Sequence, residues 1–143
     1  HYPFVKRDLL IFGAIYHDIG KLWELSIEKG FQYTDRGRLV GHMQIACEMV
    51  DEQAGLILGF PQELKDILKH IILSHHGRLE YGSPKRPKFI EAQIVAMIDD
   101  LDSKVNSMQG LIQEEIDSSW TRYNSQFDRY LYTEIYKKQT TEE

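Results

Sequence analysis

Cysteine is almost absent from this chain: among 143 residues there is only Cys47. A single cysteine excludes an internal disulfide and is typical of a protein in a reducing compartment, so we expect a cytoplasmic location. Long apolar runs are missing too, since no stretch approaches the roughly 18–20 apolar residues that a membrane-spanning helix needs. We therefore expect no membrane association, and no signal peptide in the polar opening HYPFVKRD.

An excess of positive charge is also missing. The chain has 17 Lys and Arg against 22 Asp and Glu, which gives a net charge of −5. The domain as a whole is therefore not built to attract a polyanion, and binding of nucleic acid would need a local basic patch or another domain. The remaining composition, 42% apolar and 27% charged residues, is that of a globular protein with its own core.

The hydrophobic pattern predicts an all-α fold, a helical bundle with short loops between neighbours. Helices are expected at residues 4–16, 38–58, 61–75, 89–104 and, in the aromatic tail, 107–137. The glycine-containing residues 26–41 predict a loop or short hairpin, and residues 77–88 predict a loop rich in Gly and Pro. In the second helix the residues expected to face inward are Leu39, Met43, Ala46 and Val50.

Six histidines are present, and the placement of three of them is informative. His17, His42 and His75 each lie at the end of, or within, an apolar helical face, where an unpaired imidazole would be costly. Asp18 adjoins the first of them, and Asp99 shares a face of small residues that points to the interior. Imidazoles and carboxylates from separate helices need a shared partner, and a divalent cation in the core would satisfy all of them.

Each of these residues alone also fits a simpler structural role. A histidine at a helix end commonly serves as a cap, which applies to His17 and to the His75–His76 pair, and Asp99 fits a solvated acidic turn. Four separate polar residues on apolar faces are harder to explain in this way, and together they favour the metal. Lys21, one turn after His17, is either a partner of the helix dipole or an ammonium that binds a phosphate oxygen.

The loop RLEYGSPKRPK supplies basic residues and an aromatic ring. On one interpretation it guides a nucleic-acid strand, with Tyr81 as a stacking surface; on the other it is a solvated turn made rigid by its prolines. The candidate substrate-binding residues are Lys21, Arg78, Tyr81, Lys85 and Arg86. Of the remaining histidines, His70 is expected at the surface and His1 is taken as incidental.

Four motifs in this order resemble the HD-domain metal-dependent phosphohydrolases: HDIGK, GH at 41–42, SHHG at 74–77 and MIDDLDSK at 97–104. The extra histidines are those of the branch that binds two metals. The segments YTDRGRLVGH, SHHGRLEYGSPKRP and WTRYNSQFDRYLY are similar to the HD domain of the YhaM-type 3′-to-5′ exoribonucleases. The resemblance covers nearly the whole chain and implies one HD domain over residues 1–143.

By this resemblance six residues would be metal ligands: His17, Asp18, His42, His75, His76 and Asp99. Asp18 would bridge two ions, Asp99 would close the first site, and the three later histidines would hold the second ion. Lys21 would contact the scissile phosphate and, with Asp18, is expected to be catalytic. Histidine and carboxylate ligands imply divalent ions, with Mn²⁺ favoured and Fe²⁺, Ni²⁺, Zn²⁺ or Mg²⁺ as alternatives.

The chain departs from the family at its beginning. The family's first ligand is a histidine on a helix that precedes YP, and the family also carries an N-terminal nucleic-acid-binding domain of the OB type. Neither is present here, and the chain lacks an initiator methionine. We therefore expect a fragment that lacks one ligand of the first metal and binds metal less completely.

The resemblance implies a metal-dependent phosphodiesterase, expected to be a 3′-to-5′ exonuclease on single-stranded RNA or DNA that uses a water activated by two metals. One alternative is hydrolysis of a cyclic dinucleotide or a nucleotide, and another is a metal-stabilised regulatory module without turnover. An OB-type segment upstream favours the polymer, whereas a sensory segment favours a signalling nucleotide. A homo-oligomer is a further open alternative.

Overall fold

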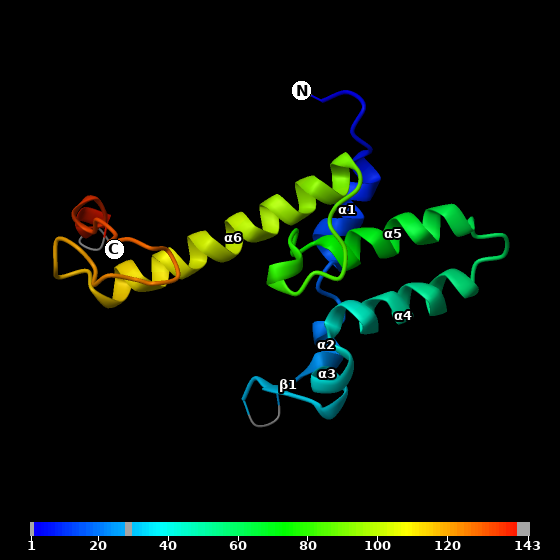
Figure 1. The fold of residues 1–143 in the computed structure, drawn as a ribbon, viewed down its shortest axis with the longest axis horizontal. Helices are drawn as coiled ribbons and strands as arrows, with labels where there is room; N and C mark the ends of the chain where they lie inside the picture. Colours follow the sequence, from blue (N-terminus) through cyan, green and yellow to red (C-terminus); the bar gives the residue numbers. More distant parts are fainter. Residues whose placement is uncertain (1, 28–29, 140–143) are drawn as a thin grey trace. The chain divides into compact units, whose positions relative to one another are not determined.

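The computed structural model describes residues 2–27 and 30–139 (Figure 1). The chain divides into two compact units, one that ends at Asp99 and one that begins at Asp100. All six predicted metal ligands belong to the first unit, so the site is described within it. The expectation of a single HD domain over residues 1–143, with further segments upstream, stays a prediction.

Helices make up most of the fold, which confirms the all-α class. The first unit contains α1 (Arg7–Tyr16), α2 (Lys21–Glu24), α3 (Asp35–Val40), α4 (His42–Gly55), α5 (Gln62–Ser74) and the 3-10 turn η1 (Leu79–Tyr81). Helix α6 (Ile90–Glu114) begins in the first unit and ends in the second, which also contains the 3-10 helix η2 (Glu134–Gln139). Strand β1 (Leu25–Ser26) pairs antiparallel with β2 (Gln32–Tyr33). Of the two alternatives for residues 26–41, a loop or a short hairpin, the structure has the hairpin, but α3 occupies the later part of this range. None of the helices in the described ranges has the length and apolar character that crossing a membrane requires.

The core of the first unit lies between α1, α4, α5 and the start of α6. Helices α4 and α5 pack against each other, and α1 packs against α5 (Figure 1). One buried cluster joins Met43, Ala46 and Cys47 of α4 to Ile72 of α5. Phe12 of α1 packs on this cluster and also on a second one, formed by α5 and α6. This packing places the end of α1, the start of α4 and the end of α5 near one another.

The second predicted helix is in fact two helices, divided at Gly41. Gly41 has a φ of +79°, a conformation that L side chains rarely adopt, and it separates α3 from α4. The predicted inward positions assume one continuous helix from residue 38, whereas a new helix begins at His42 with its own orientation. For this reason the inward position predicted for Leu39 is wrong, and its side chain is 85% exposed. Met43 and Ala46 are buried as expected.

The helix predicted for residues 107–137 is confirmed only as far as Glu114, where α6 ends, and is wrong for residues 115–133. After α6 ends, the chain forms turns with two isolated antiparallel bridges, Trp120 with Tyr132 and Asn124 with Arg129. The Oδ1 atom of Asn124 accepts the main-chain N–H of Phe127 at 3.1 Å. Side-chain bonds of this kind offer the backbone an alternative to helical hydrogen bonding, which explains the turn.

Candidate metal centre

A tight turn after α1 carries the HD pair. Helix α1 ends at Tyr16, and residues 17–20 lead directly into α2. Gly20 has an ordinary helical φ of −62°, but a Cβ atom on it would lie 2.0 Å from the main-chain oxygen of His42. Glycine is required because the start of α4 lies directly against the turn. This close approach brings Asp18 beside His42.

The structure brings the six predicted ligands together in two groups. Within each group the candidate ligand atoms all lie within 4.8 Å of one another. We call the first group, His17, Asp18 and Asp99, the mixed cluster, and the second group, His42, His75 and His76, the histidine cluster. Their role as metal ligands stays a prediction, and their positions are those that the prediction requires.

Asp18 faces both clusters, with one carboxyl oxygen towards each. Its Oδ2 atom lies 3.5 Å from Nε2 of His17. Its Oδ1 atom lies 3.5 Å from Nε2 of His42 and 3.5 Å from Nε2 of His75. Asp99 completes the mixed cluster, with Oδ1 at 3.5 Å from Nε2 of His17.

Three of the four imidazoles are oriented by main-chain carbonyl groups. In each case the ring Nδ1 atom lies within hydrogen-bonding distance of a main-chain oxygen. The distances are 2.8 Å from His17 to Gly13, 2.6 Å from His75 to Ile72 and 3.0 Å from His76 to Tyr81. A carbonyl oxygen can only accept a hydrogen bond, so Nδ1 must carry the proton in each ring. In a neutral ring this leaves the Nε2 lone pair free, which is the form in which imidazole binds a metal.

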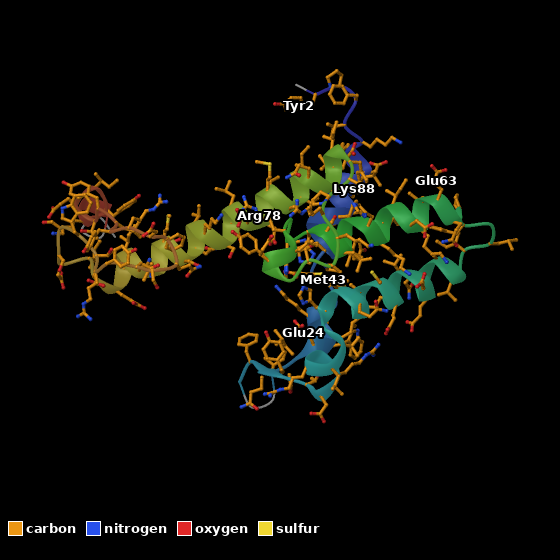
Figure 2. The ribbon with its side chains drawn as sticks, viewed as in Figure 1. Tyr2, Glu24, Met43, Glu63, Arg78 and Lys88 are labelled. Carbon is orange, nitrogen blue, oxygen red and sulfur yellow. The ribbon has the colours of Figure 1, made fainter. Side chains whose placement is uncertain are left out.

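The fourth imidazole, His42, is oriented by a carboxyl group that the sequence analysis did not single out. Glu24, the last residue of α2, is only 6% exposed, and its Oε1 atom accepts the Nδ1–H of His42 at 3.1 Å. Glu24 and Met43, both labelled in Figure 2, line one pocket with His42. One signal was available in the sequence: a ligand histidine needs an acceptor for its Nδ1–H, and Glu24 follows HDIGK closely.

Three buried polar atoms have no hydrogen-bond partner within the described residues. They are Oδ1 of Asp18, Nε2 of His42 and Nε2 of His75. Such groups are normally paired, because each buried unpaired group costs about 1–3 kcal/mol. The two nitrogen atoms each lie 3.5 Å from the Asp18 oxygen. Imidazole nitrogen and carboxylate oxygen are the kinds of donor atom that bind divalent cations. The residues therefore fit a metal ion.

The charges in the mixed cluster favour the ionised carboxylates. Burial raises the pKa of Asp18, but the neighbouring His75 and Lys21 outweigh it and hold the pKa well below its ordinary value. The hydrogen-bonding contact with His17 lowers the pKa of Asp99, and the same contact raises the pKa of His17. Both aspartates are thus held in the form that binds a cation.

Lys21 lies beside the same oxygen of Asp18 that faces the mixed cluster. Its Nζ atom is 2.6 Å from Oδ2 of Asp18, and its side chain is 45% exposed. The ammonium group is therefore at the edge of the centre and accessible from solvent. Its predicted contact with a scissile phosphate stays a prediction.

The predicted substrate-binding loop adjoins the histidine cluster, but its residues differ in position. Tyr81 lines a pocket of about 470 Å³ beside this cluster, whereas Arg78, Lys85 and Arg86 are not among its lining residues. The guanidinium of Arg78, labelled in Figure 2, lies 5.7 Å from the centre of the Tyr81 ring, a cation–π distance. All four side chains are exposed, so they are accessible to a ligand.

Two further residues that the sequence brought into question, His70 and Asp102, lie outside both clusters. His70 is partly exposed, in line with the predicted surface position, and it also has two contacts: its Nε2 accepts the main-chain N–H of Lys88 at 3.0 Å, and its ring packs against Phe89. Burial lowers the pKa of His70. Asp102 is exposed and lies outside the mixed cluster. His1 falls outside the described residues.

Several known proteins are similar to this chain over most of its length. The 3′-5′ exoribonuclease YhaM of Listeria welshimeri is 45% identical over 112 residues, which cover 78% of this chain and 36% of that protein. The YhaM of Bacillus pumilus is 46% identical over 114 residues, covering 78% and 35%. The YhaM of Bacillus subtilis is 44% identical over 112 residues, which cover 78% of this chain and 35% of that protein.

The chain therefore spans about a third of the length of these relatives. No solved structure matches it. The family model described as the HD domain matches residues 1–104, a range that contains every residue of both clusters. This chain belongs to the HD domain family.

Proposed function

We propose that this chain is the metal-dependent phosphodiesterase domain of a 3′-to-5′ exonuclease that acts on single-stranded RNA or DNA. The observation that carries the proposal is the position of Asp18. Its Oδ2 atom lies 3.5 Å from an imidazole of the mixed cluster, and its Oδ1 atom lies 3.5 Å from two imidazoles of the histidine cluster. A shared carboxylate between two ligand groups is what a site for two adjacent cations needs. The relatives named 3′-5′ exoribonuclease support a polymer substrate and a direction of cleavage.

In this proposal His17, Asp18 and Asp99 would hold one divalent cation and His42, His75 and His76 a second, with Asp18 able to contribute to both. Imidazole donors favour Mn²⁺, Fe²⁺, Ni²⁺ or Zn²⁺ over Mg²⁺, which prefers oxygen ligands, and among these Mn²⁺ is our first choice. The three unpaired buried atoms support this assignment, because cation binding would remove their desolvation cost.

Two bound cations would activate a water molecule and stabilise charge at phosphorus during an in-line displacement. Lys21 would add a positive charge at the open edge of the mixed cluster, where it can offset charge on a phosphoryl oxygen. The hydrogen bonds at Nδ1 keep the imidazoles from rotating, so their Nε2 atoms stay directed at the centre. Asp18 and Lys21 are the proposed catalytic residues.

The loop after α5 would bind the substrate strand. The Tyr81 ring is 52% exposed and lies at the pocket beside the histidine cluster, where a base can stack on it. Arg78, Lys85 and Arg86 supply exposed positive charge for the phosphates in a chain whose net charge is −5. These roles are part of the proposal.

A cytoplasmic location belongs to the same proposal. It is supported by the single cysteine, Cys47, whose thiol is free and buried. Burial raises the pKa of this thiol to about 11, which disfavours the reactive thiolate. A homo-oligomer stays a prediction.

The test is release of nucleoside monophosphates from a 3′-tailed single-stranded RNA oligonucleotide by the full-length protein. We expect activity with Mn²⁺, none with EDTA, and a loss of about 10³-fold or more in Asp18→Ala, since both clusters lose a ligand and about 4 kcal/mol of barrier reduction goes with them. The matched control is Asp102→Ala, an exposed aspartate outside both clusters. Wild-type-like activity of Asp18→Ala would refute the proposal.

A further inference from the structure

Glu24 differs from every other group that orients an imidazole in this centre. The Nδ1 atoms of His17, His75 and His76 all contact main-chain oxygens, which no substitution removes. Nδ1 of His42 instead contacts a side chain, the carboxyl group of Glu24. Glu24 is 6% exposed, although burial of a carboxyl group is costly. A buried acid at this position needs a reason.

The two hydrogen bonds of the Glu24 carboxyl group both come from one residue, His42. Its Oε1 atom accepts the main-chain N–H of His42 at 3.0 Å and the Nδ1–H of the same residue at 3.1 Å. Because Oε1 already accepts the main-chain N–H, it acts as an acceptor. The ring nitrogen that contacts it, Nδ1, is then the one that carries the proton. Nε2 of His42 then carries the lone pair, and this atom is buried, unpartnered and 3.5 Å from Oδ1 of Asp18.

We propose that Glu24 is a positioning residue for the metal centre: it fixes the tautomer and orientation of His42 and so sets the cation affinity of the histidine cluster. The chemistry is that of a carboxylate–histidine–metal triad, in which the carboxylate also makes the imidazole a stronger donor. The inference rests on the proposed function only in requiring that the histidine cluster binds a divalent cation. It requires no particular substrate.

Glu24 also has a plain structural contact that must be separated from this role. Helix α4 begins without a side-chain cap, since Gly41 is its N-cap, and Glu24 accepts the first N–H of the helix. Loss of such a cap costs about 1 kcal/mol of folding stability whatever the ring does. The chain offers a matched control in Glu91, also buried, which accepts the main-chain N–H of Lys6 at 2.7 Å at the start of α1.

The experiment compares Glu24→Ala, Glu24→Gln and Glu91→Ala with the wild-type full chain. Affinity for Mn²⁺ and Zn²⁺ alone is measured by calorimetry, and the tautomer of His42 by long-range ¹H–¹⁵N NMR in EDTA at about pH 8, where an imidazole is neutral. Glu24→Ala should weaken one of the two cation sites about 10–100-fold and mix the His42 tautomers. Glu24→Gln should keep the tautomer, because its amide oxygen still accepts, and lose less affinity. Glu91→Ala should lower thermal stability without changing either reading.

A second set of variants asks whether the effect passes through His42. In a His42→Ala background, Glu24→Ala should cause no further loss of cation affinity, as in a closed double-mutant cycle. Equal affinity of Glu24→Ala and Glu91→Ala, or an undiminished loss in the His42→Ala background, would overturn the role. These readings need no turnover, so a protein that binds cations as described but releases no nucleotides would contradict the proposed function alone.

Discussion

Asp18 lies between the mixed cluster and the histidine cluster, with one carboxyl oxygen facing each, and the two clusters differ in chemistry. The histidine cluster offers three imidazoles, whereas the mixed cluster offers one imidazole and two carboxylates. Carboxylate oxygens suit harder cations and carry charge, while neutral imidazoles suit transition metals. In the proposed site, one carboxylate at the junction of two helix ends would join two ligand groups with unlike metal preferences.

The two clusters also differ in the burial of one residue. His75 is completely buried, whereas the other five residues of the two clusters are only partly buried. Lys21, whose side chain is 45% exposed, lies beside the mixed cluster. The histidine cluster is the one in which a side-chain carboxyl group, that of Glu24, contacts the Nδ1 atom of a ring.

The largest effect is expected when one ligand is removed from one cluster at a time. His75→Ala should empty the histidine cluster and leave the mixed cluster filled, and His17→Ala should do the reverse, because Asp18 remains in both variants. Affinity at the affected cluster should fall by more than the roughly 100-fold that follows loss of an outer-shell partner. Metal content of the full-length protein after dialysis, measured by plasma mass spectrometry, checks this.

The control for both variants is His70→Ala. His70 is a histidine of α5 that contacts Lys88 and Phe89 and belongs to neither cluster. It should leave the metal content unchanged. If His75→Ala and His17→Ala each lost both ions, the clusters would not be separable sites.

A smaller effect is expected at the junction between the clusters. Gly20→Ala places a Cβ atom against the main chain of His42, so α4 must move away from the turn that carries Asp18. We expect the free energy of unfolding to fall by about 2–4 kcal/mol, with weaker metal binding at both clusters. Chemical denaturation and calorimetry measure the two quantities.

Gly55→Ala is the matched control for this change. Gly55 is the last residue of α4, and a Cβ atom on it would meet nothing within 4 Å. Alanine there should leave metal binding unchanged and raise stability by up to about 1 kcal/mol. A Gly20→Ala protein as stable as wild type would show that the close approach to His42 is not needed.

The smallest effect is expected from removing the charge of Asp99 in metal-free protein. Asp99 raises the pKa of His17, so Asp99→Asn should lower it, whereas Asp102→Asn should not change it. Because the pKa of His17 is higher in the folded state than its ordinary value of 6.5, the protonated ring stabilises the folded protein. This stabilisation is fully present below pH 6.5 and is lost as the pH rises through the pKa that His17 has in the folded state.

Wild type in EDTA should therefore lose stability as the pH rises above about 6.5, and Asp99→Asn should lose less. NMR titration of His17 and thermal unfolding at several pH values give the two measurements. An unchanged pKa of His17 in Asp99→Asn would show that Asp99 and His17 do not influence each other's ionisation.

Most of the predicted ligand set followed from polar residues on apolar helical faces, whereas the role of His76 came only from the family resemblance. His17, His42, His75 and Asp99 are each unexpected on such a face, and helical spacing directs them to one interior. The structure places them together with Asp18. Helix boundaries were predictable where apolar spacing is strong, as in α5, which begins at Gln62 directly after Pro61.

What could not be predicted depends on contacts between distant segments. The inward position of Leu39 failed because a single glycine with positive φ, Gly41, resets the helical phase. The need for Gly20 comes from the main chain of His42, 22 residues later in number, which no local pattern reveals. Glu24 could be suspected, because a ligand histidine needs an acceptor for its Nδ1–H, but its pairing with His42, 18 residues later, is set by the tertiary fold.

The main-chain acceptors at Gly13, Ile72 and Tyr81 have a consequence for protein engineering. The orientation of three imidazoles is inherited with the backbone, so it survives almost any exchange of neighbouring side chains. A designer who transplants these histidines into another bundle must therefore copy the helix ends, because copying the surrounding residues would not reproduce the acceptors. His42 is the exception, and its ring orientation would be lost in a graft that omits one glutamate.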